Sequence, residues 1–133
     1  MKTGFSPAAR ILPVDDNPHG LTARKMILEE HGYSVKTAVS GEQAWQIIRE
    51  SAFDVVVTDF RMGEMNGGEL IRLIRASDST ARIILLSGFV ACLGLSEEDT
   101  GADEVICKSN KEIPELLRAL KKLAHRPIRR ARR

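Results

Sequence analysis

The sequence has few of the residues that hold together small disulfide-rich or metal-bound domains. Only two of its 133 residues are cysteine, and Cys92 and Cys107 fit neither a CxxC metal site nor a paired framework, so we expect no disulfide. The three histidines are far apart and lack the spacing of metal ligands. An apolar core must therefore stabilise the chain, and a single domain of this length is large enough to bury one.

Long apolar runs are also absent. No stretch approaches the roughly 20 apolar residues that span a membrane. The first seven residues lack the apolar centre of a signal peptide, so nothing in them argues for export. We therefore expect a cytoplasmic protein with no membrane span.

Positive charge is concentrated at one end of the chain. Five arginines fall in the last eight residues, and without them the net charge of +2 becomes −3. This run is short and has no interleaved aromatic residues, so we interpret it as a disordered basic tail and expect no nucleic-acid binding. The sequence thus divides into an N-terminal extension at residues 1–8, one domain at 9–124 and a basic tail at 125–133.

Strand-like and helical patterns alternate along the domain. Apolar runs typical of strands occupy residues 10–14, 33–39, 53–58, 83–86 and 105–107. Such alternation favours βαβ units. Five of them with short connections predict an α/β fold with a five-stranded, parallel, doubly wound sheet.

Capping residues mark where three of the predicted helices begin. These starts are Asn17 before Pro18, a capping box from Ser40 to Gln43, and Asn66 with Glu69. The last helix is predicted at residues 111–123. Residues 88–101 contain three glycines and no clear helical period, so we assign no helix ends there.

The first predicted helix has an imperfect apolar face. It begins at Pro18, and Gly32 supplies its stop. The apolar residues of this face are Leu21, Ala23, Ile27 and Leu28. Two cations, Arg24 and Lys25, interrupt the face.

Polar residues end four of the five predicted strands. Asp15 and Asp16 follow the first run, Asp59 the third, Ser87 the fourth and Lys108 the fifth. Doubly wound sheets bind ligands at the carboxyl ends of their strands, so these five side chains should converge. Three carboxylates, a hydroxyl and an ammonium group in one place would suit a divalent cation and a phosphoryl group.

The order and spacing of these elements resemble those of a known family. The motifs are Ile11-Leu12-Pro13-Val14-Asp15-Asp16-Asn17, Val57-Thr58-Asp59-Phe60-Arg61-Met62, Met65-Asn66-Gly67, Leu86-Ser87-Gly88, Gly101-Ala102-Asp103 and Cys107-Lys108. Over residues 9–124 the chain resembles a response-regulator receiver domain of two-component signalling, of the stand-alone, chemotaxis-regulator-like kind. The resemblance implies a flavodoxin-like (βα)5 fold with strand order 2-1-3-4-5.

The resemblance also implies how the site works. Asp59 matches the aspartate that accepts a phosphoryl group from a phosphohistidine, and Lys108 and Ser87 match the lysine and the hydroxyl that contact this group. The implied donor is a sensor histidine kinase or a histidine phosphotransfer protein, and the output is binding to an unknown downstream protein. Such a chain catalyses only its own phosphorylation and dephosphorylation, so it is not an enzyme in the usual sense.

The acid pair implies a magnesium site. By resemblance, Asp15 and Asp16 bind Mg²⁺ together with Asp59 and the backbone carbonyl of Arg61. Clustered carboxylates favour a hard cation, and Mg²⁺ also accepts phosphate oxygens directly. Asp59 can then act as a carboxylate nucleophile on phosphorus.

Four positions depart from the usual receiver pattern. Val105 stands where an aromatic switch residue is usual, and Ser109 replaces the proline that usually follows the lysine. Gly63 replaces a proline after the phosphoacceptor, and Pro13 removes a backbone donor from an interior strand. We therefore expect phosphorylation to be retained and the conformational output to be altered.

Two other functions stay open. A degenerate receiver would bind its partner without being phosphorylated, and the departures at Val105, Ser109 and Gly63 favour it. An aspartate-nucleophile phosphohydrolase of the haloacid dehalogenase type needs two aspartates separated by one residue, whereas Asp15 and Asp16 are adjacent. Mg²⁺ binding without phosphorylation would indicate the first, and turnover of a phosphate ester would indicate the second.

Overall fold

The computed structural model describes residues 8–88, 94 and 96–124. The predicted basic tail, nearly all of the N-terminal extension, and Cys92 lie outside these residues. So does part of the stretch at 88–101, whose described remainder includes the short helix α5 (Glu97–Thr100).

Five strands form one parallel sheet. They are β1 (Arg10–Val14), β2 (Ser34–Val35), β3 (Val55–Asp59), β4 (Arg82–Ser87) and β5 (Glu104–Cys107). Their order across the sheet is β2-β1-β3-β4-β5, and every neighbouring pair is parallel. The predicted α/β fold with strand order 2-1-3-4-5 is confirmed.

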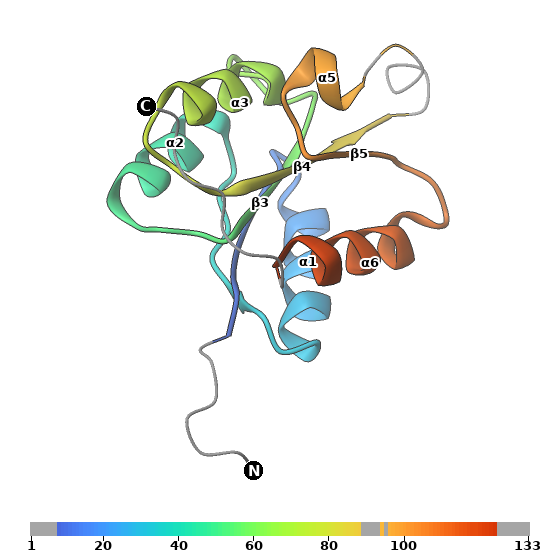
Figure 1. Ribbon diagram of the computed structural model, residues 1–133. Coiled ribbons are helices and arrows are strands. Elements are labelled where there is room, and N and C mark those ends of the chain that lie inside the picture. The colour runs from blue at the N-terminus through green and yellow to red at the C-terminus, as the bar shows by residue number, and fades with distance from the viewer. Residues whose placement is uncertain (1–7, 89–93, 95, 125–133) are drawn as a thin grey trace.

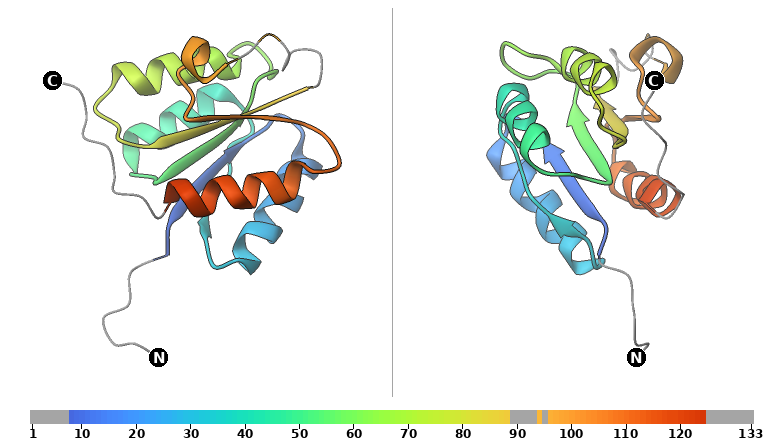
Figure 2. Two further views of the ribbon diagram at one scale, coloured as in Figure 1. Left: turned by 45° about the vertical axis from the view of Figure 1, so that its right-hand side comes forward. Right: turned by 60° about the vertical axis from the view of Figure 1, so that its left-hand side comes forward.

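Helices cover both faces of this sheet (Figure 1). The longer ones are α1 (Pro18–Glu30), α2 (Gly41–Glu50), α3 (Gly67–Ala76) and α6 (Glu112–Ala124). Helices α1 and α6 lie on one face, whereas α2, α3 and α5 lie on the other, as the further views in Figure 2 also show. No helix within the described ranges is long and apolar enough to cross a membrane.

Alternate strand residues build two separate cores. The core under α2 and α3 takes Leu12, Val14, Val56, Ile83 and Leu85 from the sheet. The core under α1 and α6 takes Ile11, Val55, Val57, Ile84 and Leu86. This alternation follows from the strand period of two, and it explains why the central strands are apolar on both faces.

Strand β2 is shorter than the predicted run at 33–39, and the cause is Pro13. Ala38 N donates to Pro13 O at 3.0 Å, so the backbone carbonyl of residue 13 faces the side of the sheet on which β2 lies. A bond from residue 13 to the carbonyl of Lys36 would continue the ladder, but proline has no N–H. The ladder therefore breaks after Val35 and resumes as a single bridge at Ala38. Pairing of β1 with β3 is unaffected, because the missing donor faces the edge strand.

The predicted helix starts are present, one of them with altered geometry. Asn66 and Glu69 form a complete capping box at the start of α3. At the start of α2, Ser40 Oγ accepts from Gln43 N at 3.0 Å, as a capping box requires. The return bond differs, because Gln43 Oε1 accepts from Val39 N at 2.7 Å and not from the N-cap residue.

Asp103 and Gly101 shape the turn before β5. Asp103 Oδ2 accepts from Arg75 Nη2 at 2.8 Å and from Ile83 N at 2.7 Å. Arg75 Nε donates to the carbonyl of Gly101 at 2.9 Å, and Gly101 has a φ angle of +83°. Glycine adopts this φ without a steric penalty, so the turn can aim β5 along β4.

Cys107, at the end of β5, is disulfide-bonded, so the expectation of no disulfide is wrong. The only other cysteine of the sequence, Cys92, lies outside the described residues. Sequence spacing misled here because folding can join thiols that no local motif pairs.

Candidate functional site

The polar residues that end the predicted strands gather at one edge of the sheet. Asp15 follows β1, Asp59 ends β3, Ser87 ends β4 and Lys108 follows β5. Backbone bonds continue past the last two strands, since Lys108 N donates to Ser87 O at 2.8 Å. The parallel ladder therefore fixes these residues side by side.

Asp59 forms an ion pair with Lys108. The Lys108 Nζ atom lies 2.8 Å from Asp59 Oδ2, and the two side chains are 37% and 4% exposed. The carboxylate is thus inside the protein, whereas the ammonium group reaches solvent. This arrangement leaves a cation at the entrance of the site, next to the predicted phosphoacceptor.

Two oxygens of the site are buried without a hydrogen-bond partner, namely Asp59 Oδ1 and Ser87 Oγ. A buried polar atom without a partner costs about 1–3 kcal/mol, so such atoms are uncommon in folded proteins. Their presence at adjacent strand ends points to a ligand that offers a positive centre to the Asp59 carboxylate oxygen and a hydrogen-bond acceptor to the Ser87 hydroxyl. A hard cation with a phosphoryl group has both.

The two buried carboxylates have opposite pKa shifts. Burial, supported by the neighbouring Asp15 carboxylate, raises the pKa of Asp59 to about 6 against the opposing effect of Lys108. Burial acts in the same sense on Asp15, but the hydrogen bonds from Asn17 N and Arg24, together with the neighbouring Asp59 carboxyl, outweigh it and lower the pKa of Asp15. Of the two groups, Asp59 therefore holds its proton to higher pH.

One of the predicted metal ligands, Asp16, is exposed, unlike the buried Asp15 and Asp59. Within the described part of the chain, no three His, Cys, Asp or Glu side chains are grouped so that they would hold a metal ion. The roles of Asp16 and of the Arg61 carbonyl stay predictions.

Sequence reasoning missed Arg24, which lies in the middle of the site. Its side chain is 10% exposed, and Nη1 lies 2.8 Å from Asp15 Oδ2. Its Nη2 lies 3.7 Å from Asp59 Oδ1 and 3.0 Å from Glu112 Oε2. One guanidinium group therefore joins carboxylates that follow β1, end β3 and begin α6.

The buried face of α1 explains how Arg24 reaches the site. The buried residues of α1 are Leu21, Arg24 and Leu28, whereas Ala23, expected on the apolar face, is exposed. These three buried residues are three and four positions apart, which places them on one stripe of a helix. The sequence signal that could have revealed this ion pair is a cation, Arg24, within the apolar stripe of a helix that follows the acid pair Asp15 and Asp16.

Gly67 sets the position of Asp59. A Cβ atom at residue 67 would lie 2.4 Å from Asp59 O and 3.0 Å from Leu85 Cδ1. The amide of Gly67 also donates to Phe60 O at 2.8 Å. The start of α3 therefore contacts the backbone at the end of β3 more closely than any other residue type would allow.

A family profile described as the response regulator receiver domain matches residues 11–121. The chain belongs to this family. Receiver domains are phosphoacceptor modules of two-component signalling, not conventional enzymes, and the sequence-based identification is confirmed.

Solved receiver structures are similar to the chain over most of its length. The response regulator TrrA of Thermotoga maritima, in complex with Mg²⁺–BeF, is 35% identical, with a TM-score of 0.76 over 86% of this chain and 98% of that one. The chemotaxis response regulator CheY4 of Vibrio cholerae is 26% identical, with a TM-score of 0.79 over 87% of this chain and 98% of that one.

The curated relatives are longer proteins. The gliding motility regulatory protein of Myxococcus xanthus is 29% identical over 89% of this chain and 16% of its own length. The virulence sensor protein BvgS of Bordetella bronchiseptica is 38% identical over 74% of this chain and 9% of its own length. The chain spans about a fifth or less of the first curated relatives that it matches.

The departures from the receiver pattern lie around the site and not among its buried acids. Val105, in the position of the usual aromatic residue, is half-buried and packs against the core under α2 and α3. Ser109 and Gly63 are exposed. The buried ion pairs of the receiver site are therefore compatible with these three changes.

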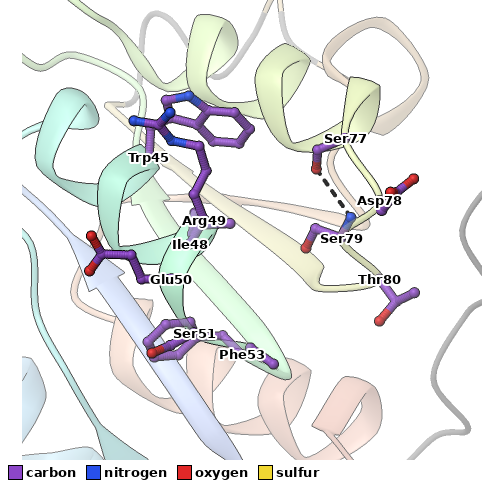
Figure 3. A pocket seen from close by; sticks show the side chains of 11 residues that line it. Trp45, Ile48, Arg49, Glu50, Ser51, Phe53, Ser77, Asp78, Ser79 and Thr80 are labelled. Atoms are coloured by element: carbon purple, nitrogen blue, oxygen red, sulfur yellow. Dashed lines mark hydrogen bonds between the residues drawn. The ribbon is translucent and has the colours of Figure 1, made fainter.

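A cavity of about 440 Å³ lies at the opposite edge of the receiver domain (Figure 3). Its lining comes from the second half of α2, the segment 51–53 before β3 and the segment 77–80 before β4. These segments precede the strands, whereas the acidic site follows them. The cavity is therefore separate from the acidic site.

Proposed function

We propose that this receiver domain accepts a phosphoryl group on Asp59 in a Mg²⁺-dependent reaction with a phosphohistidine donor. The observation that carries the proposal is the pair of buried, unbonded oxygens, Asp59 Oδ1 and Ser87 Oγ, at the same edge as the Lys108 ammonium group. These atoms offer a nucleophile, a hydrogen-bond donor and a positive charge to one phosphoryl group.

Asp59 is the nucleophile in this proposal. One of its oxygens bonds to phosphorus while the bond from phosphorus to the donor's imidazole nitrogen breaks, and the electron pair leaves with the imidazole. The product is an acyl phosphate. Lys108, now 2.8 Å from Asp59 Oδ2, neutralises charge on the phosphoryl oxygens, and Ser87 Oγ donates a hydrogen bond to one of them.

The acidic residues have the chemistry of a Mg²⁺ site. Asp15, Asp16 and Asp59 would hold the ion together with the Arg61 carbonyl, and bound Mg²⁺ supplies positive charge to the phosphoryl oxygens. The unbonded, buried Asp59 Oδ1 suits an oxygen-seeking cation. Asp16 is exposed and has to turn inward in this proposal. The similarity to TrrA, solved with Mg²⁺–BeF, supports it.

The phosphorylated domain signals in the cytoplasm through partner binding. Its donor is a sensor histidine kinase or a histidine phosphotransfer protein. The similarity to regulatory and sensor proteins such as AlgB of Pseudomonas aeruginosa and BvgS supports a place in a two-component pathway. The chain catalyses only the gain and loss of its own phosphoryl group.

Incubation with acetyl phosphate and Mg²⁺ tests the acceptor. Intact-mass and Phos-tag analysis are expected to show a phosphorylated species that is absent from Asp59→Asn and from samples with excess EDTA. A receiver of established activity, treated in parallel, is the positive control for the reagent. A product that persists in Asp59→Asn would contradict the assignment of Asp59.

The alternative is an interaction module that acts without phosphorylation. Val105, which packs into the core where an aromatic switch residue is usual, is the observation that favours it. If Mg²⁺ binds but neither acetyl phosphate nor a panel of phosphorylated histidine kinases gives a product, this alternative replaces the proposal.

A further inference from the structure

Arg24 is the residue of the acidic site that the phosphoacceptor chemistry leaves without a role. It projects from the buried stripe of α1 and is the one charged residue of this helix that is buried. A buried cation is costly unless it is paired, and Arg24 is paired with three carboxylates. Its position among these three carboxylates therefore indicates a role at the acidic site in addition to packing.

The contacts of Arg24 overlap with those expected of a metal ion. Arg24 Nη1 donates to Asp15 Oδ2 at 2.8 Å, while Asp15 Oδ1 accepts from Asn17 N at 3.0 Å. Both oxygens of this carboxylate are thus bonded. Arg24 Nη2 also lies within ion-pair distance, 3.7 Å, of the unbonded Asp59 Oδ1. A divalent cation between Asp15 and Asp59 would meet a second positive charge at short range, which is repulsive.

Glu112, the first residue of α6, holds the other side of the guanidinium. Its Oε2 accepts from Arg24 Nη2 at 3.0 Å and from Nε at 3.3 Å. Arg24 can therefore release its single bond to Asp15 and keep two bonds to Glu112. The guanidinium plane favours such paired contacts with one carboxylate.

We propose that Arg24 is a built-in counter-cation that competes with Mg²⁺ for Asp15, and that Glu112 retains the guanidinium when the metal displaces it. This inference rests on the proposed function, because it assumes that the acidic site binds Mg²⁺. Arg24 is a positioning residue here and not a ligand of the phosphoryl group. In this proposal Mg²⁺ replaces the Arg24 guanidinium at Asp15, and the guanidinium stays bonded to Glu112 at the start of α6.

Calorimetric titration of Mg²⁺ alone into the full chain tests the competition. Arg24→Met, which keeps the length of the side chain and removes its charge, is expected to tighten Mg²⁺ binding about tenfold, since a charge-assisted hydrogen bond to Asp15 is lost. Arg24→Lys keeps the charge without the planar fork and should fall in between. Lys25→Met removes one charge from the exposed side of α1 and should change the Kd less than twofold.

Glu112→Gln gives the opposite prediction. With its second partner weakened, Arg24 binds Asp15 more firmly, so Mg²⁺ should bind about threefold more weakly. In an Arg24→Met background the same change should have little effect, because no guanidinium is left to redirect. This double-mutant cycle separates competition from a general effect of charge, which would lower the affinity equally in both backgrounds.

The outcomes distinguish this inference from the proposed function. Mg²⁺ binding by the natural chain with an unchanged or weaker Kd in Arg24→Met would overturn the inference alone. Equal effects of Glu112→Gln in both backgrounds would remove Glu112 from it. Absence of Mg²⁺ binding in every folded variant would overturn both the inference and the Mg²⁺-dependence of the proposed function. If Arg24→Met does not fold, Arg24→Lys and Glu112→Gln decide the question.

Discussion

Asp59 has to satisfy two opposed conditions. As the nucleophile of the proposed reaction it must be ionised, whereas burial and the Asp15 carboxylate raise its pKa to about 6. The Lys108 ammonium group only partly offsets this effect, because it is close to solvent. A cation bound beside Asp59 favours the charged form and so prepares the carboxylate for attack.

The raised pKa of Asp59 predicts how stability depends on pH in Mg²⁺-free buffer. Between pH 4 and about 6 the folded chain holds a proton on Asp59 that the unfolded chain has released. The free energy of unfolding therefore falls as pH rises through this window, relative to Asp59→Asn. At pH 7 we expect the variant to be more stable by about 1–3 kcal/mol. Urea denaturation at a series of pH values measures this difference, and parallel curves for the two proteins would contradict the shift.

Asp15 acts in the opposite sense, which is why the comparison with Asp59→Asn is needed. Its pKa is lowered, so its contribution to stability is present above the pKa of the unfolded chain and is lost as pH falls. The Asp15 contribution therefore changes mainly below about pH 4, whereas the Asp59 contribution changes between pH 4 and about 6. The difference between the natural chain and Asp59→Asn isolates the Asp59 contribution.

Ser87 and Thr58 offer a matched pair of buried hydroxyl groups. Ser87 Oγ has no hydrogen-bond partner, whereas Thr58 Oγ1 donates to Asp59 O at 2.9 Å. Ser87→Ala should leave the free energy of unfolding unchanged or raise it by up to about 1 kcal/mol, and Thr58→Val should lower it by about 1 kcal/mol. Ser87→Ala should nevertheless slow phosphorylation. Equal destabilisation of both variants would mean that Ser87 has a partner in solution.

At the scale of an element, the start of α3 packs closely against the backbone of Asp59, the proposed phosphoacceptor. Gly67→Ala would place a Cβ atom 2.4 Å from Asp59 O, so the helix or the strand end has to move. We expect a loss of about 1–3 kcal/mol in the free energy of unfolding and slower phosphorylation of Asp59. Denaturation curves and intact-mass time courses measure the two effects.

Gly63→Ala is the control for this prediction. Nothing lies within 4 Å of a Cβ atom at residue 63, and its backbone needs no positive φ angle. Its free energy of unfolding should change by less than about 0.5 kcal/mol. If both variants behave alike, flexibility of the loop and not the contact with Asp59 explains the effect of Gly67→Ala.

Elements whose geometry is decided locally could be predicted from the sequence, and the others could not. The capping box of Asn66 and Glu69 needs only four consecutive residues, so its pattern was sufficient. The length of β2 depends on a donor missing from Pro13 in another strand. The loss of a backbone donor at Pro13 could be predicted from the sequence. Which neighbouring strand would lose a hydrogen bond depends on the side to which the backbone of Pro13 faces, and that needed the structure.

At the scale of the whole molecule, the same distinction separates Asp59 from Arg24. Alternating strands and helices predict the sheet, and parallel strands align their carboxyl ends, so Asp15, Asp59, Ser87 and Lys108 could be placed together. Arg24 reaches the site from a helix face, and its partner Glu112 is 88 residues away in sequence. No strand-end rule covers such a contact. The side-chain direction of Asp16, which is exposed, also needed the fold.

The separation of the cavity from the acidic site has a consequence for optical measurements. Trp45 is the only tryptophan of the chain, and it lines that cavity beside Arg49, whose guanidinium carbon lies 5.6 Å from the indole centroid (Figure 3). Its emission follows the packing of the core under α2 and α3, so it reports unfolding well. The proposed site for Mg²⁺ and the phosphoryl group lies at the other edge of the sheet. Tryptophan fluorescence is therefore not expected to report binding at the acidic site. A fluorophore has to be attached near that site before binding there can be followed by fluorescence.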